Sequence, residues 1–245
     1  MKKKILIIGG TSGIMISCIE RLLEKNYQIF ASYNNDDSLK NLPSKIQDSR
    51  NITFFKLNLL DDNDKITETL SNLKIEADII INAVGGSFGI KEYSFDIKDW
   101  VKLLELNILK HIFINNLFIN KMIKNKFGRI LFFSTSAVED KNASIIYSTT
   151  KAFLENYVVK SANTFGKHNV LVNCIKTSVI AAKNNNWFKA SLQKPDFVRE
   201  FAKKYISVER VGTAEDLVDF VDLIISEKNN FMNGSIVKID GGFKF

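Results

Sequence analysis

Ile5-Leu-Ile-Ile-Gly-Gly-Thr-Ser-Gly-Ile-Met15, near the start of the chain, joins a short apolar run to a glycine-rich turn. The apolar run predicts a buried strand, Lys4–Ile8, and the residues after the turn predict a helix, Gly13–Lys25. Glycines at such a turn let backbone N–H groups approach a pyrophosphate, and the helix N-terminus adds the positive end of its dipole. The turn Gly9–Met15 is therefore a candidate site for a dinucleotide.

The rest of the chain repeats this order of strand and helix. Short apolar runs predict further strands at Gln28–Tyr33, Thr53–Leu57, Ile79–Asn82, Arg129–Ser134, Val170–Ile175 and Ser235–Ile239. Apolar residues at spacings of three and four predict helices at Asp62–Leu73, Ile97–Lys124, Ala143–Gly166 and Ala214–Ser226. Such alternation is typical of right-handed βαβ units. We therefore predict an α/β fold, a single Rossmann-type domain over residues 1–245 with a doubly wound parallel sheet of about seven strands and helices on both faces.

Residues 181–210 fit this alternation worst. They begin with Lys183-Asn-Asn-Asn186 and then carry aromatic residues around Pro195, namely Trp187, Phe188, Phe197 and Phe201. A helical lid over a substrate pocket would have this composition, and so would an ordinary pair of surface helices. Both interpretations stay open at this point.

Composition limits the class of protein. The 245 residues are 45% hydrophobic and 25% charged, which suits one domain with a sizeable core. No apolar run approaches the length of a membrane span, and Ile5–Ile8 is too short for a secretory signal. We therefore expect a cytoplasmic protein that does not enter a membrane.

The chain is basic, with 34 Lys and Arg against 27 Asp and Glu, a formal charge of +7. The lysines are scattered, and no basic run beyond Lys2–Lys4 or basic stretch interleaved with aromatic residues occurs. Nucleic-acid binding is therefore not indicated. A positive field would instead favour an anionic cofactor or substrate.

The cysteines and histidines do not have the spacing of metal ligands. Cys18 and Cys174 fall in a predicted helix and a predicted buried strand, where they would act as small core residues. His111 and His168 are expected at the surface or at an interface. We predict no metal site.

Tyr147 and Lys151 stand four residues apart in a predicted helix and so share one of its faces. A tyrosine has a reference pKa near ~10 and exchanges protons poorly at neutral pH. A nearby cation favours the phenolate and lowers that pKa, which suits the pair to proton transfer at a carbonyl or alcohol oxygen.

Together with the glycine turn, this pair resembles the short-chain dehydrogenase/reductase family, and the resemblance covers essentially the whole chain. The further matching motifs follow in the family's order: Asn82-Ala-Val-Gly85, Asn107, Gly128–Ser136, Asn173, Arg210–Asp216 and Asn233–Gly242. The departures from the family pattern are Met15 at a glycine position, Thr177-Ser178 for Pro-Gly, Ala182 for threonine and Asn58 for aspartate.

The resemblance implies a catalytic set. Tyr147 would exchange a proton with the substrate oxygen, and Lys151 would lower the tyrosine pKa and bind the nicotinamide ribose. Asn107 would support the lysine through a water. A hydroxyl after the fifth strand would orient the substrate oxygen, and Thr135 is favoured, with Ser134 and Ser136 as alternatives.

The resemblance also implies a cofactor site. The NADP(H) form is favoured over NAD(H), because Tyr33 stands where an acidic residue would select NAD; Asp36 and Asp37, slightly later, keep NAD(H) open. The implied cofactor-binding residues are Gly9, Thr11, Ser12, Gly13, Ile14, Tyr33, Asn34, Asn58, Leu59, Asn82, Ala83, Gly85, Tyr147, Lys151 and Ile180.

The implied function is an NAD(P)-dependent oxidoreductase that interconverts a carbonyl and an alcohol on a small molecule. It would resemble a 3-oxoacyl-thioester reductase or a sugar/polyol dehydrogenase. The alternative is a catalytically impaired member that serves as a dinucleotide-binding or regulatory module.

A homodimer or homotetramer is also implied, through the helices Ile97–Lys124 and Ala143–Gly166. The first of these is apolar over much of its surface, at Ile108, Ile112, Phe113, Leu117 and Phe118. Alternatively, the sheet covers all of these side chains in a monomer.

The substrate pocket is expected at the carboxyl ends of the strands, between Gly86–Tyr93, Ser136–Ile146 and residues 181–210. Its predicted aromatic lining would make the substrate partly apolar, and two lysines could contact an anion. These side chains are Phe88, Tyr93, Trp187 and Phe188, with Lys183 and Lys189.

Overall fold

A computed structural model describes residues 2–25, 27–90, 96–183 and 185–244. The strands of its main sheet are β1(Lys3–Ile8), β2(Tyr27–Tyr33), β3(Ile52–Lys56), β4(Ile79–Asn82), β5(Gly128–Thr135), β6(Val170–Thr177) and β9(Ile236–Ile239). The longer helices are α1(Gly13–Leu23), α4(Asn63–Asn72), α5(Ile97–Leu104), α6(Lys110–Asn125), α7(Ile145–Phe165) and α10(Glu215–Ile225). Short helical pieces are α2(Asp36–Lys40), α3(Ser44–Gln47), η1(Glu105–Leu109), η2(Ser136–Val138) and η3(Gly166–His168).

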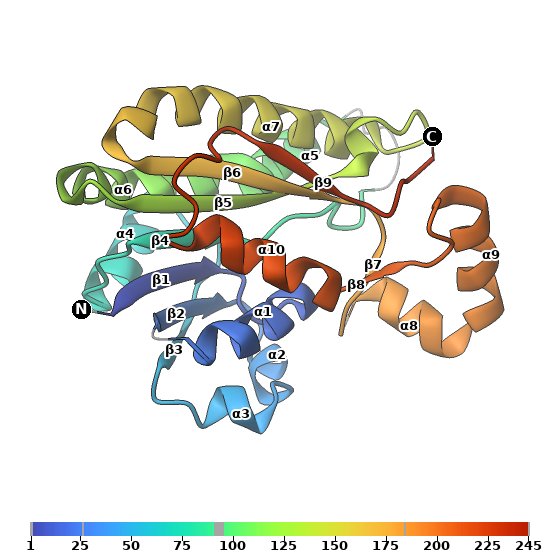
Figure 1. Ribbon diagram of the computed structural model, residues 1–245, viewed down its shortest axis with the longest axis horizontal. Coiled ribbons are helices and arrows are strands. Elements are labelled where there is room, and N and C mark those ends of the chain that lie inside the picture. The colour runs from blue at the N-terminus through green and yellow to red at the C-terminus, as the bar shows by residue number, and fades with distance from the viewer. Residues whose placement is uncertain (1, 26, 91–95, 184, 245) are drawn as a thin grey trace.

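The main sheet has seven strands in the order β3-β2-β1-β4-β5-β6-β9, and every neighbouring pair is parallel. The predicted single-domain α/β fold with a doubly wound sheet is confirmed. Because all strands run the same way, their carboxyl ends meet at one edge, on the right of Figure 1.

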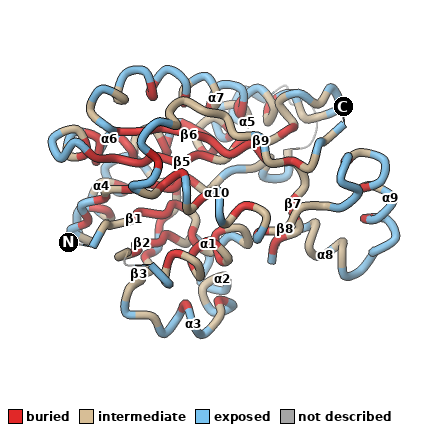
Figure 2. Tube along the Cα trace, in the orientation of Figure 1, coloured by how far each residue is buried: buried red, intermediate tan, exposed pale blue. Residues whose placement is uncertain are grey.

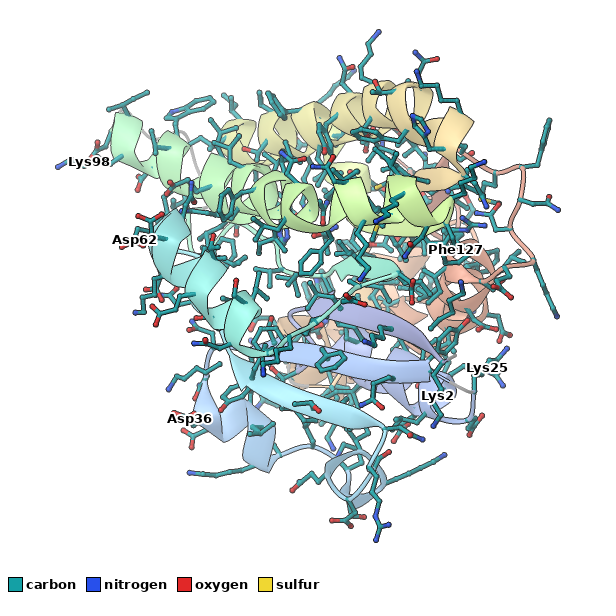
Figure 3. The ribbon with its side chains drawn as sticks, turned by 90° about the vertical axis from the view of Figure 1, so that its left-hand side faces the viewer. Lys2, Lys25, Asp36, Asp62, Lys98 and Phe127 are labelled. Atoms are coloured by element: carbon teal, nitrogen blue, oxygen red, sulfur yellow. The ribbon has the colours of Figure 1, made fainter. Side chains whose placement is uncertain are left out.

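Helices cover both faces of the sheet, as Figures 1 and 3 show. On one face α4, α6 and α7 pack against side chains that include Leu6 and Ile8 of β1. On the other, α1, α3 and α10 pack against side chains that include Ile5 and Ile7. Consecutive strand residues point to opposite faces, so a strand buried on both sides must be apolar throughout. The run Ile5–Ile8 is fully buried for this reason.

The predicted helix Ile97–Lys124 is interrupted. The π-helical segment η1 separates α5 from α6, and Asn107 lies in its middle. The Asn107 Nδ2 donates to the carbonyl oxygen of Leu103 at 3.0 Å, the oxygen that the backbone N–H of residue 107 would use in an α-helix. This competition accounts for the local change in hydrogen bonding, which the apolar periodicity does not reveal.

Residues 181–210 form a separate feature at the carboxyl edge of the sheet. The two-residue strands β7(Ile180–Ala181) and β8(Gly212–Thr213) pair in parallel and bracket α8(Asn186–Gln193) and α9(Pro195–Tyr205). We call α8 and α9 the lobe (residues 186–205). The lobe projects from the sheet on the right of Figure 1, and Figure 2 shows its surface as largely exposed.

Candidate active site

Three adjoining cavities follow the carboxyl ends of the strands. The first lies beside β1 and β2 and shares Ser12 and residues 83–85 with the second. The second shares Ile14, Thr135, Thr177 and Ser178 with the third, which extends under the lobe. The shared walls make one continuous trough along this edge.

The first cavity holds most of the predicted cofactor residues. Its lining includes Gly9, Thr11, Ser12, Tyr33, Asn34, Leu59, Ala83 and Gly85. Gly9 has a φ of +92°, and a Cβ there would lie 2.7 Å from Val84 Cγ2. A larger residue at Gly9 is therefore excluded by both conformation and space.

The turn between β1 and α1 is suited to an anionic group. Ser12 precedes α1 but makes no side-chain hydrogen bond to its first turn. The N–H groups that begin a helix lack internal partners and carry the positive end of its dipole. Met15, which replaces a family glycine, is fully buried in the core under this turn. Its long side chain therefore leaves the cavity open.

The second cavity contains Thr135, Tyr147 and Lys151, three of the four predicted catalytic residues. The Lys151 Nζ donates to the carbonyl oxygen of Phe133 at 2.8 Å. The side chains of Tyr147 and Thr135 line this cavity together and interact. One turn after Lys151, the Glu155 carboxylate accepts from Ser134 Oγ at 2.5 Å.

Three residues of α7, spaced four apart, thus contact three successive residues at the end of β5. We call β5, α7 and β6 the catalytic frame. Glu155 was not among the predicted residues, although its spacing of four from Lys151 places it on the same helical face.

The three candidate hydroxyls point to different partners. Ser134 Oγ donates to Glu155, and Ser136 Oγ donates to Asp240 Oδ2 at 3.1 Å; both serines are buried. Thr135 lines both the second and the third cavity; its Oγ1 accepts from the Ala137 N–H at 3.2 Å, and its side chain interacts with Tyr147. Of the three, Thr135 is the side chain engaged with the tyrosine.

Burial dominates the titration of the Tyr147–Lys151 pair. Burial raises the pKa of Tyr147, and the interaction with Thr135 only partly offsets that rise. Burial lowers the pKa of Lys151 to about 8, while the charge of Glu155 is one of the effects that raise it. Lys151 is not among the groups that shift the pKa of Tyr147 in this structure, so the lowering of the tyrosine pKa by Lys151 stays a prediction.

A salt-bridge network centred on the buried Lys176, here called the ion bridge, joins the frame to Glu139. Lys176 of β6 is 4% exposed, and its Nζ donates to Glu139 Oε1 at 2.7 Å and to Glu155 Oε2 at 3.2 Å. Burial lowers the pKa of Lys176, but hydrogen bonds to the two carboxylates outweigh it and hold the pKa above its usual value. Glu155 is therefore fixed between Ser134 and Lys176.

Asn107 lies behind the second cavity and does not line it. The Asn107 Oδ1 accepts from the Gly86 N–H at 2.9 Å, and Nδ2 donates to the Gly86 carbonyl at 3.0 Å. A Cβ on Gly85 would lie 2.7 Å from Lys151 Nζ and 3.0 Å from Asn107 Oδ1. Asn107 thus holds the loop after β4, and only glycine fits at position 85.

His111 is buried rather than at the surface or an interface, so the expectation for this residue was wrong. Its Nε2 lies 2.9 Å from the carbonyl oxygen of Val84, to which it would donate. Burial lowers the pKa of His111 to about 4, and the charge of Lys151 adds to this effect. His111 is therefore neutral at physiological pH.

Four predicted cofactor residues, Gly13, Asn58, Asn82 and Ile180, do not line the first or second cavity. Asn58 bonds to the Leu60 N–H and to Asp61, and Asn82 is buried in the sheet with its Nδ2 3.4 Å from the Leu131 carbonyl. Gly13 packs against the backbone of Ala182 and Lys183, which follow β7. A Cβ at Gly13 would lie 2.1 Å from the Lys183 carbonyl oxygen. Ile180 lines the third cavity.

The third cavity has a volume of about 410 Å³ and corresponds to the expected substrate pocket. Trp187 lines it as predicted, together with Phe201 and Phe243. Phe188 and Lys183 line a different cavity, beside Gly13. The predicted lining by Phe188 is wrong because adjacent helix residues point about 100° apart.

The remaining pocket predictions have mixed outcomes. Residues 86–90, Phe88 among them, do not line the third cavity, and neither does Lys189. Phe88 is instead 44% exposed. Tyr93 lies outside the described residues. The predicted wall Ser136–Ile146 contributes Ser136, Ala137 and Asp140.

Among residues 2–25, 27–90, 96–183 and 185–244, no group of three or more His, Cys, Asp or Glu side chains is arranged to hold a metal ion. In the same part of the chain, no helix combines the length and apolarity needed to span a bilayer.

A sequence profile of the family described as short chain dehydrogenase matches residues 3–192, so the chain belongs to this family. With the fold and the trough, this makes the protein an NAD(P)-dependent oxidoreductase that acts on a carbonyl/alcohol pair.

Individual relatives span nearly the whole chain. The 3-oxoacyl-[acyl-carrier-protein] reductase FabG of Aquifex aeolicus is 25% identical over 242 residues, covering 97% of this chain and 95% of the relative. The L-rhamnose 1-dehydrogenase (NADP(+)) of Thermoplasma acidophilum is 25% identical over 246 residues, covering 98% and 95%.

The fold also matches solved structures. One is a 3-oxoacyl (acyl-carrier-protein) reductase from Agrobacterium tumefaciens C58 with NADP bound. It has a TM-score of 0.87 at 20% identity and covers 98% of this chain and 93% of the other.

Proposed function

We propose that the protein is an NADP(H)-dependent reductase of a small-molecule ketone or aldehyde, working reversibly on the matching alcohol. The observation that carries this proposal is that Thr135, Tyr147 and Lys151 line the second cavity together and that Thr135 also lines the third. A 3-oxoacyl-thioester reductase and a sugar dehydrogenase, the activities in its relatives' names, are the two reference substrate classes.

The residues present suit a nicotinamide dinucleotide. The uncapped start of α1 would hold the pyrophosphate, and the glycine at position 85 keeps space beside Lys151. A nicotinamide cofactor, when bound, supplies or accepts the hydride. We assign to Lys151 the binding of the cofactor ribose. We assign to Asn107 the support of the loop after β4, which would face the cofactor.

In this mechanism the Thr135 hydroxyl hydrogen-bonds to the substrate oxygen and orients it. Tyr147 donates its proton to that oxygen during reduction and takes it back during oxidation. Because burial raises the pKa of Tyr147, the phenol is protonated at neutral pH, as reduction requires. The positive charge of Lys151, whose pKa is about 8, stabilises negative charge that develops on the oxygens nearby.

The test is Tyr147→Phe, compared with Tyr157→Phe on the same helix. Tyr157 packs edge-on against Phe132 in the core, away from the cavity. We expect Tyr147→Phe to lower kcat on ketone substrates by about 10²–10⁴-fold while NADPH binding, followed by fluorescence, stays within about threefold. Retained turnover in Tyr147→Phe would show that the proton comes from another group, and loss of activity in both variants would indicate a structural effect.

The preference for NADP(H) rests on the lining of the first cavity. Tyr33, Asn34, Asn35 and Ser38 line it at and after the end of β2, and no carboxylate is among the lining residues that the structure describes. Asp36 is instead paired with Lys56 at 2.7 Å. We expect NADPH to bind more tightly than NADH and Tyr33→Asp to reverse that order, because a carboxylate repels the 2′-phosphate. Tighter binding of NADH by the unmodified protein would contradict this preference.

We also propose a homodimer or homotetramer. Of the five residues expected to make the predicted helix Ile97–Lys124 apolar, Ile108 and Phe118 are buried in the monomer and Leu117 is 40% exposed. Other apolar side chains stay exposed on α5, η1 and α7, namely Val101, Leu109, Ile145, Phe153 and Val159. A monomer mass in light scattering at micromolar concentration would contradict the proposal.

A further inference from the structure

The walls of the third cavity restrict what can lie next to Thr135. Three aromatic side chains line it, Trp187 from α8, Phe201 from α9 and Phe243 near the C-terminus. The rings of Trp187 and Phe201 are 4.7 Å apart between centroids. Tyr205 extends this row, 4.9 Å from Phe201 and 6.5 Å from Phe243. Side chains from α8, from α9 and from the C-terminal segment therefore form one aromatic wall.

Among the described residues that line this cavity, Asp140 is the only one with an ionisable side chain. Its Oδ1 accepts from the Asn142 N–H at 2.9 Å, which fixes the carboxylate in a short turn. The structure gives Oδ2 no hydrogen-bond or ion-pair partner among the described residues. One carboxylate oxygen is thus held in place and the other is free to accept from a ligand.

Among the described residues of the cavity wall, none carries a positive charge that would compensate Asp140. The polar side chains that share the lining are neutral: Thr135, Ser136, Thr177, Ser178 and Asn185. The two lysines expected to contact an anion are elsewhere, since Lys183 lines the cavity beside Gly13 and Lys189 does not line the third cavity. The described lining residues therefore carry a negative charge, although the whole chain carries +7.

We propose that the substrate is an amino ketone or amino alcohol whose protonated amine binds at Asp140 and the aromatic wall. This inference rests on the proposed function and deepens it by giving the substrate class. A carboxylate beside aromatic faces suits an ammonium group, through an ion pair and cation–π contacts. The amine takes no part in the redox step, in which the carbonyl carbon gains a hydride and its oxygen a proton. A substrate with a carboxylate in this position would be repelled by Asp140.

The test uses three aryl ketones of equal length that end in an ammonium, a hydroxyl or a carboxylate group, each assayed with NADPH. We expect kcat/KM to fall in that order by about tenfold per step, as for single charges near a protein surface. In Asp140→Asn, the ratio of kcat/KM for the ammonium ketone to kcat/KM for the hydroxyl ketone should come close to one. Asp196→Asn is the matched control, because Asp196 is an exposed lobe carboxylate paired with Arg199, and it should leave the ratio unchanged.

A preference for the hydroxyl or carboxylate ketone, or a ratio that survives Asp140→Asn, would overturn the inference. Where none of the ketones turns over, binding of each to the NADPH complex of Tyr147→Phe is measured by tryptophan fluorescence. Equal binding of all three would overturn the inference. Tighter binding of the ammonium ketone, without turnover in the unmodified protein, would support the pocket assignment and count against the proposed reductase function instead.

Discussion

The catalytic frame and the lobe lie side by side at the active site, yet they are built differently. In the frame, every residue of β6 is buried, and α7 buries seven of its side chains. In the lobe, α8 has no buried residue and α9 has only Val198 and Ala202. The groups proposed for proton transfer therefore sit on a well-buried core, whereas two of the aromatic side chains proposed to contact the substrate, Trp187 and Phe201, sit on a shallow attachment.

This difference has a physical consequence for substitutions. A buried side chain contributes transfer free energy and packing, and its loss leaves a cavity. An exposed side chain can change with little effect on folding. The free energy of unfolding should therefore respond strongly to substitutions in the frame and only weakly to substitutions at exposed positions of the lobe.

The largest expected effect comes from the same substitution made in each region. Leu154→Ala in α7 removes a side chain that is 1% exposed, and we expect it to lower the free energy of unfolding by about 2–5 kcal/mol. Leu192→Ala in α8 removes a side chain that is 69% exposed and should change the free energy of unfolding by no more than about 0.5 kcal/mol. Urea denaturation of both variants measures the contrast. Equal losses would mean that the lobe belongs to the folding core.

The ion bridge of the frame gives the next contrast. Lys176→Met leaves Glu139 and Glu155 without their shared cation, and we expect a loss of about 3 kcal/mol, the lower end for a broken buried pair because Glu139 is 42% exposed. Lys203→Met in the lobe removes a lysine that is 53% exposed and 3.8 Å from Glu200, which should cost no more than about 0.5 kcal/mol. Thermal unfolding of both variants is the measurement. A loss below about 1 kcal/mol for Lys176→Met would show that solvent readily reaches the bridge.

His111 predicts how stability changes with pH. Its pKa of about 4 in the folded protein lies below the usual value near ~6.5 of the unfolded chain. Between these values the unfolded chain binds a proton that the folded protein does not, so stability falls as pH falls. We expect His111 to account for about 2 kcal/mol of the loss between about pH 7 and about pH 5.

His111→Gln should remove that contribution, so that unfolding curves at the two pH values move closer together. His168→Gln is the matched control, because His168 is only partly buried. An unchanged pH dependence in His111→Gln would show that the folded protein takes up the proton at His111.

The fold and the order of the site residues were predictable because they depend on patterns that lie along the chain. Apolar runs such as Ile5–Ile8 must be buried on both faces, which requires a covered parallel sheet. Tyr147 and Lys151 share a helical face whatever surrounds them.

The features that the sequence did not reveal depend on packing between distant segments. Trp187 and Phe188 are equally aromatic neighbours, and only the docking of α8 decides which of them lines the third cavity. The π-helical segment at Asn107 depends on the Gly86 loop that this side chain holds. The raised pKa of Tyr147 depends on the burial of its phenol, which no local pattern reports.

The smallest expected effect is the most direct test of how separate the two regions are. Amides in a shallow attachment exchange with solvent through local opening, whereas amides in a core exchange through global unfolding. In hydrogen-exchange mass spectrometry, peptides from the lobe should therefore exchange faster than peptides from α7. Leu154→Ala should then speed exchange in α7 by about 30-fold or more, the factor that corresponds to ~2 kcal/mol, and leave the lobe unchanged within about twofold. Faster exchange in both regions of Leu154→Ala would show that the lobe unfolds together with the frame and would remove the distinction between them.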